Sequence, residues 1–142
     1  MPSRPESHET RDIDEVNMLN DKAALATLPV RNIDVARKFY ESTVGLTPIP
    51  TEEPGVAGFR SGNSTVLVYE SQYAGTNKAT AATWVVGDEV DDVVRALKAK
   101  GVKFEHYDLP DTTRNGDVHV SGRTRVAWFK DPDGNILSLV NG

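Results

Sequence analysis

The fold is decided by a stretch near the C-terminus, Val126-Ala127-Trp128-Phe129-Lys130-Asp131-Pro132-Asp133-Gly134-Asn135-Ile136-Leu137. Two β-rich runs, 124–129 and 136–140, flank a short polar segment at 131–135. Within it, Pro132 presets φ for a turn and Gly134 supplies a positive φ. The segment therefore predicts a tight hairpin turn, with two antiparallel strands at the end of the chain.

A second informative stretch lies in the first third of the chain, where 23–30 is predicted to be a strand. Asn32, or Asp34 slightly later, offers a helix N-cap. The apolar residues between 35 and 40 fall at helical spacing, and Gly45 ends the helix as a left-handed C-cap. Short β-rich runs follow at 46–49, 56–60 and 65–69.

The same order of elements then repeats. A strand is expected at 80–86, a helix at 88–100 ended by Gly101, and strands at 102–107, 124–129 and 136–140, with 110–120 as a polar, irregular excursion. Val30, Gly45 and Leu46 have counterparts in Val86, Gly101 and Val102 at one constant offset. The sequence predicts an α+β fold of two βαβββ modules, about 22–71 and 79–142, that curl around a cleft and descend from an ancient duplication.

Composition bounds the rest. The 142 residues suit one domain, placed at 22–142, after a polar segment at 1–21 that is expected to be disordered or loosely docked. The net charge of −5 and the lack of a basic stripe disfavour nucleic acid. Cysteine is absent, which excludes disulfides and thiolate chemistry. No run approaches the roughly 18 apolar residues of a membrane span, and no secretory signal is recognisable, so a cytoplasmic protein is expected.

Two signatures carry a family resemblance. The first is Leu28-Pro29-Val30-Arg31-Asn32-Ile33-Asp34 followed by Phe39-Tyr40 and Gly45-Leu46, and the second is the stretch 126–137. In this order and at this separation they resemble the glyoxalase / bleomycin-resistance / dioxygenase (vicinal oxygen chelate) superfamily. The resemblance implies the curved two-module fold, but the fold serves isomerases, lyases, dioxygenases, thiol transferases and metal-free binding proteins.

The resemblance also implies where metal ligands would stand, because the metal enzymes of this superfamily use His and Glu from four strands facing the cleft. Counting from the motifs places these four positions at Leu25, Leu67, Ala82 and Ser138. Borderline metals prefer imidazole or carboxylate ligands, and none of the four residues, nor their immediate neighbours, supplies one. The sequence therefore predicts no metal at these positions and no cofactor.

Strand alternation predicts the lining of the cleft. The residues in step with the four vacant positions are Leu25, Thr27, Leu67, Tyr69, Ala82, Trp84, Val86, Ile136 and Ser138. The opposite set, including Val85, Leu137 and Leu139, is expected under the helices. The predicted lining is apolar and aromatic with a few hydroxyls, as in small-molecule pockets. Trp84 and Tyr69 are the candidates for stacking a flat ligand, or alternatively for core or dimer packing.

Candidates for acid/base chemistry are few. His106, predicted on the sixth strand, is the first by residue type, and Glu70, at the end of its strand, is the second; either could instead be a surface residue. His119 is predicted in a loop. His106, Asp108, Asp117 and His119 could form a displaced metal site if the excursion at 110–120 folds back.

Three functions remain open from sequence. The first is a metal-free protein that sequesters an aromatic or amphipathic compound, as bleomycin-resistance proteins do. The second is an enzyme of the same superfamily, either with displaced metal ligands or with His/Glu acid-base catalysis. The third is an accessory domain with a vestigial cleft. The resemblance also leads us to expect a homodimer, with a small molecule as its other partner.

Overall fold

The computed structural model describes residues 19–20 and 22–142, so the predicted tail at 1–21 lies almost wholly outside the described residues. Within that part of the chain, no helix is long and apolar enough to cross a membrane. The first module contains β1 (Ala26–Val30), α2 (Ile33–Lys38), a π-helical turn η2 (Phe39–Thr43), β2 (Thr47–Ile49), β3 (Val56–Ser61) and β4 (Ser64–Glu70).

The second module repeats this order with one addition. It contains β5 (Thr80–Val85), a 3₁₀ turn η3 (Gly87–Glu89), α3 (Val90–Ala99), β6 (Phe104–Glu105), β7 (Thr113–Asn115), β8 (Val118–Ser121), β9 (Thr124–Lys130) and β10 (Ile136–Val140). The addition is the β7–β8 hairpin, which the sequence had indicated as irregular. Conversely, β6 is much shorter than the predicted strand at 102–107.

Helix α2 begins as its sequence predicts. The Asn32 side chain accepts hydrogen bonds from the amides of Asp34 at 2.9 Å and Val35 at 3.1 Å, which makes Asn32 rather than Asp34 the N-cap. Beyond the helical segment, Gly45 takes a φ of +89°, the left-handed conformation that favours glycine. Both ends of the helical segment are thus set by local chemistry.

Each module forms one sheet. The first has the strand order β1-β4-β3-β2, and the second has the order β5-β10-β9-β8-β7, with β6 also pairing with β9. In both modules the first strand pairs in parallel with the last, β1 with β4 and β5 with β10, while the other pairs are antiparallel. This repetition confirms the predicted α+β fold and the C-terminal hairpin.

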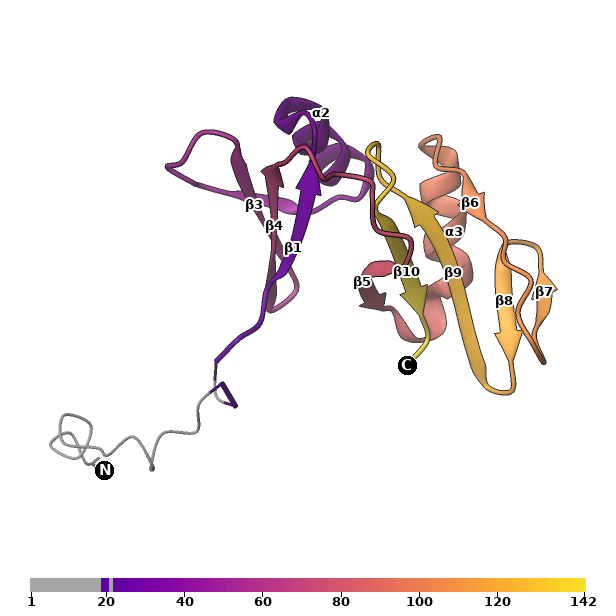
Figure 1. Cartoon of the computed structure of the whole chain (residues 1–142). Coiled ribbons are helices and arrows are strands. Elements are labelled where there is room, and N and C mark those ends of the chain that lie inside the picture. Colours follow the sequence, from indigo (N-terminus) through magenta and orange to yellow (C-terminus); the bar gives the residue numbers. More distant parts are fainter. Residues whose placement is uncertain (1–18, 21) are drawn as a thin grey trace, which may run out of the picture.

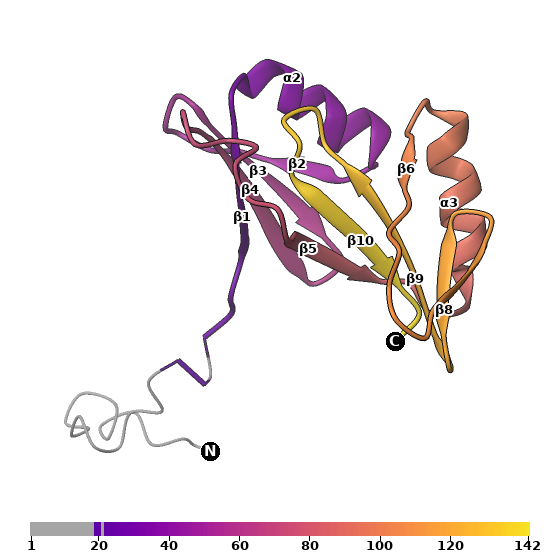
Figure 2. The same cartoon turned by 45° about the vertical axis from the view of Figure 1, so that its right-hand side comes forward.

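The modules lie edge to edge, with β1 and β5 facing each other, as Figure 1 shows. Figure 2 shows α2 along the top of the molecule and α3 at its right-hand side. The ammonium group of Lys100, at the end of α3, donates to the carbonyl of Ser42 at 3.0 Å. Between the sheets, the Trp84 indole N–H donates to the Ser61 hydroxyl at 2.8 Å. One apolar core, with members from both modules, lies beneath the two helices.

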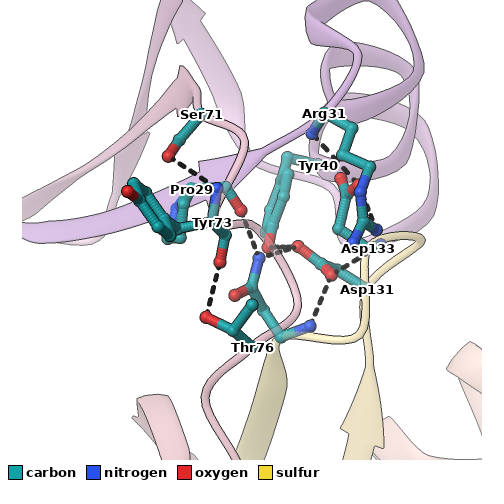
Figure 3. Close-up of polar contacts among 9 residues, drawn as sticks. Pro29, Arg31, Tyr40, Ser71, Tyr73, Thr76, Asp131 and Asp133 are labelled. Atoms are coloured by element: carbon teal, nitrogen blue, oxygen red, sulfur yellow. Dashed lines mark hydrogen bonds and ion pairs between the residues drawn. The ribbon is translucent and has the colours of Figure 1, made fainter.

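A buried polar network joins the C-terminal hairpin to the first module (Figure 3). The Tyr40 hydroxyl donates to Asp131 Oδ2 at 2.8 Å. The Asn135 amide donates to Asp131 Oδ2 and to the Pro29 carbonyl, each at 2.8 Å. Tyr40, Asp131 and Asn135 are all buried, and burial followed by the nearby Asp131 charge raises the pKa of Tyr40. The phenol therefore stays protonated and acts as a donor.

Candidate functional site

One face of each sheet is left uncovered by the helices, and we call it the open face. In the first module, Leu28 pairs with Val68 and both side chains are buried in the core beneath α2. Side chains alternate along a strand, so Thr27 and its partner Leu67 point to the open face. Tyr69 lies there too, with 38% of its surface exposed. Leu25 stands just before β1 and is 45% exposed.

In the second module, the open face is centred on a pair of hydroxyl groups. Thr83 pairs with Ser138 between β5 and β10, and the two side-chain oxygens are 2.7 Å apart. Its strand neighbours Leu137 and Leu139 point to the core, so Ser138 points to the opposite face. Ser138 is nevertheless buried there, with 3% of its surface exposed. The structure thus places Ser138 on the open face, as the alternation predicts.

The predicted face of Ala82 and Trp84 needs correction. Ala82 pairs with Leu137 and Trp84 with Leu139, so both point to the helix-covered side, where Trp84 stacks on Phe129 with ring centroids 6.5 Å apart. Val85, predicted under the helices, is instead 70% exposed. The position predicted in β5 to face the cleft, Ala82, was one residue away from Thr83, which does face it. A shift of one residue exchanges the two faces of a strand. The register of β10 against β5 itself shifts between Ile136 and Leu137.

With this correction, the central positions of the two open faces are Thr27 and Leu67 in one module and Thr83 and Ser138 in the other. Their side chains are hydrocarbon or hydroxyl, which do not form the imidazole and carboxylate sites of borderline metals. Over residues 19–20 and 22–142, no group of three or more His, Cys, Asp or Glu side chains is arranged to hold a metal ion.

An aromatic cluster extends the open face beyond Ser138. Trp128 is the cross-strand partner of Ser138 on β9, and its indole N–H donates to the Thr80 hydroxyl at 3.1 Å. Tyr107 packs edge-on against Trp128 with ring centroids 5.2 Å apart, and His119 does so at 4.8 Å. The sheet pairing fixes the register of Trp128 and places its side chain on the same face as Ser138.

His119 was predicted in a loop, and this prediction is wrong. It lies in β8, is 1% exposed, and its Nε2 accepts a 2.9 Å hydrogen bond from the Tyr107 amide. Burial lowers the pKa of His119, and the amide N–H holds the Nδ1–H tautomer. The alternation Val118-His119-Val120 was a strand signal, hidden within a segment whose overall composition is polar.

His106 follows directly after β6 instead of lying within a long strand. Its Nε2 is 2.8 Å from Asp117 Oδ1, and the Lys98 ammonium donates to Asp117 Oδ2 at 2.7 Å. These hydrogen bonds, from Lys98 first and His106 second, lower the pKa of Asp117. The rings of His106 and His119 are 6.3 Å apart, so the excursion does fold back and brings part of the predicted constellation together.

Glu70, the other acid/base candidate, lies in the first module at the end of β4. Its Oε2 accepts a 3.1 Å hydrogen bond from the Ile33 amide, the first residue of α2. Its own amide donates to the Gly55 carbonyl at 2.9 Å. A carboxylate at this position satisfies a free amide at the helix N-terminus. Because His106 and Glu70 belong to different modules, the structure does not bring the two acid/base candidates together.

Solved structures with the same fold span nearly the whole domain. A glyoxalase/bleomycin resistance protein/dioxygenase from Nocardioides has a TM-score of 0.62 and 16% identity, covering 96% of this chain and 92% of its own. The fosfomycin resistance protein FosX from Listeria monocytogenes, complexed with Mn(II) and sulfate, has a TM-score of 0.64 and 19% identity, covering 87% and 90%. Lactoylglutathione lyase from Agrobacterium tumefaciens has a TM-score of 0.63 and 18% identity, covering 84% and 92%.

At these identities the solved structures support the fold and not an activity. No curated protein sequence matches the chain. A family model matches residues 22–139, which include both modules and both signatures quoted above. The chain therefore belongs to the Glyoxalase/Bleomycin resistance protein/Dioxygenase superfamily.

Proposed function

We propose that this protein binds an aromatic or amphipathic small molecule on its open face, without a metal ion, as a sequestering protein does. The observation that carries the proposal is the row formed by Thr83, Ser138 and Trp128 across three neighbouring strands. It combines two hydroxyl groups with an aromatic surface, the composition that small-molecule sites commonly use.

The chemistry of this row favours a ligand that is partly flat and partly polar. Trp128 is half-buried, and its indole N–H is held by Thr80, so the ring orientation is fixed before a ligand arrives. A fixed aromatic surface binds with little loss of side-chain entropy. The Thr83 and Ser138 hydroxyls can donate to or accept from a polar group at the edge of the ligand.

A second copy of the chain is part of the proposal. Leu25, Tyr69 and Val85 are large apolar side chains exposed on or beside the open faces of the two modules. A homodimer that covers them would enclose the bound compound and remove apolar surface from water. We place this homodimer in the cytoplasm, in keeping with a chain that has no cysteine.

Tryptophan fluorescence tests the site. The chain has two tryptophans, Trp128 on the open face and Trp84 on the helix-covered face. We expect a panel of aromatic metabolites and glycopeptide drugs, with fosfomycin added because of the FosX likeness, to contain a compound that quenches the emission saturably. Trp128→Phe should abolish the response and Trp84→Phe should retain it. A response that follows Trp84 would place the ligand elsewhere.

Metal analysis tests the other half of the proposal. Protein purified without chelators is measured by elemental analysis, and binding of the fluorescent ligand is repeated after treatment with EDTA. We expect substoichiometric metal and unchanged affinity. A stoichiometric metal ion whose removal abolishes binding would instead bring the protein close to the Mn(II)-bound FosX structure.

One observation favours a second candidate, an enzyme. Asp117 contacts Nε2 of His106, which leaves Nδ1 available as a base, and such a carboxylate–imidazole pair is a common acid/base arrangement. If the compound identified by fluorescence is converted, His106→Gln should reduce turnover more than binding. Glu70→Gln is the companion variant, and retained turnover would exclude Glu70 from the chemistry.

A further inference from the structure

A separate cavity lies at the edge of the second sheet, between the segment 106–112 and the β7–β8 hairpin. Its volume is about 230 Å³, and its lining includes His106, Tyr107, Asp108, Thr113, Arg114 and His119. Neither Trp128 nor Ser138 contributes to it. Tyr107 and His119 line this cavity and also pack against Trp128, so the cavity adjoins the row proposed above as the ligand site without sharing its residues.

Arg114 supplies the cavity with a positive charge. It is exposed on β7, directly opposite His119 on β8, and its charge is one of the causes that lower the pKa of His119, after burial. Four of the described arginines form ion pairs with carboxylates, as Arg125 does with Asp91 at 2.8 Å, whereas Arg114, like Arg60 and Arg123, has no carboxylate partner among the described residues. A guanidinium beside a hollow is suited to a bidentate carboxylate contact.

Two of the lining residues carry a buried polar atom without a hydrogen-bond partner. These atoms are Oη of Tyr107 and Nδ1 of His119. Burial, and then the charge of Glu105, raises the pKa of Tyr107, which keeps its hydroxyl a donor. His119 carries its proton on Nδ1 because Nε2 accepts from the Tyr107 amide. Buried donors without acceptors are uncommon and costly, so the unpaired atoms mark the wall of this cavity as a place where a ligand oxygen that reached them would lower the free energy.

We propose that this cavity is a second ligand site, which binds a small organic monocarboxylate with Arg114 as its anchor. The carboxylate accepts hydrogen bonds from the exposed guanidinium of Arg114, and the aromatic walls formed by Tyr107 and His119 contact its carbon skeleton. Asp108 on the lining places a negative charge beside the anion. This charge repels a dianion such as sulfate more strongly than a monoanion.

Benzoate is the probe that tests the site, titrated by calorimetry and by NMR of the histidine C–H resonances. We expect saturable one-to-one binding. Arg114→Gln should weaken the affinity at least tenfold, because a charged hydrogen-bonded pair contributes more than 1.4 kcal/mol. The benzoate affinity of Arg114→Lys should lie between those of wild type and Arg114→Gln, since lysine keeps the charge and loses the bidentate geometry. The matched control is Arg123→Gln, an equal change of charge on the exposed turn between β8 and β9.

A further readout concerns His119 itself. Bound benzoate offsets the charge of Arg114, so the pKa of His119 should rise on saturation in the wild-type protein and stay unchanged in Arg114→Gln. Equal weakening by the Arg114 and Arg123 variants would overturn the proposal, as would equal affinity for sulfate. So would the absence of saturable binding up to about 10 mM. Thr83→Val, a change within the open-face row at a residue that does not line the cavity, should leave benzoate affinity unchanged, which separates this site from the one on the open face.

Discussion

The Tyr40 hydroxyl donates a 2.8 Å hydrogen bond to Asp131, although the two residues are 91 positions apart in the chain. Tyr40 belongs to the first signature and Asp131 begins the turn of the second. The two motifs that identify the superfamily in this sequence therefore contact each other. Their chemistry holds the C-terminal hairpin against the first module, and so fixes the relative position of the two open faces.

Replacing Tyr40 with Phe tests this contact. The change keeps the ring in the core and removes only the donor, so Asp131 loses one of its partners in a buried setting. We expect the free energy of unfolding in urea to fall by about 1–3 kcal/mol. Tyr73→Phe is the matched control. Because Tyr73 is 68% exposed, this variant should keep almost all of the wild-type free energy of unfolding. Equal stability of both variants would contradict the structural role of the Tyr40 hydroxyl.

Asn135→Asp tests the same network from the other side. The amide of Asn135 donates to Asp131 and to the Pro29 carbonyl, and a carboxylate would place like charge and acceptors where donors are needed. The new carboxyl would have a raised pKa in the folded state. The stability deficit relative to wild type should therefore be largest at neutral pH and shrink as the pH falls towards 5. Urea denaturation at both pH values measures it, and a deficit independent of pH would refute the explanation.

Much of the fold could be predicted because local chemistry specifies it. Asn32 caps α2, and Gly134, with a φ of +92°, allows the turn of the final hairpin. These features depend on residues close in sequence, and the repetition of the order strand, helix, strands supplies the rest. The constant offset between Gly45 and Gly101 was one of the signals that predicted two repeated modules, and the structure has one sheet in each half of the chain.

The candidate site was less predictable because it depends on register. The face of Trp84 is set by the pairing of β5 with β10, and the register of that pairing shifts at Ile136. Such a shift is a tertiary event with no local signature. His119 is buried, and the rings of Tyr107 and Trp128 pack against it, contacts that no periodicity within β8 reveals.

Gly75→Ala tests how tightly the connector between modules packs on the final turn. Gly75 has a φ of +77°, and a Cβ there would overlap the carbonyl oxygen of Asp133. Gly62 also has a positive φ, +58°, but its Cβ would meet nothing within 4 Å. We expect Gly62→Ala to cost about 1 kcal/mol and Gly75→Ala about 3 kcal/mol in urea unfolding. Similar losses for the two variants would show that the close approach is easily relieved.

His119 should make the fold sensitive to mild acid. Burial lowers its pKa in the folded protein, so below the unfolded value of about 6.5 the unfolded chain binds more protons than the native one. Stability then falls as the pH drops from about 6.5 through the folded pKa, by at most about 1.4 kcal/mol per pH unit. Protonated Nε2 could no longer accept from the Tyr107 amide, so 106–112 should loosen first.

His119→Gln isolates this contribution. Its side-chain carbonyl can still accept from the Tyr107 amide, but it cannot be protonated in this range. The variant should therefore resemble wild type in its free energy of unfolding in urea at pH 7.5. Between pH 7.5 and pH 5.5, this free energy should fall less in the variant than in wild type. Hydrogen exchange of the Tyr107 amide should accelerate in acid, beyond its intrinsic pH dependence, only in the wild-type protein. Parallel pH profiles for the two proteins would show that the buried imidazole is not the group that responds.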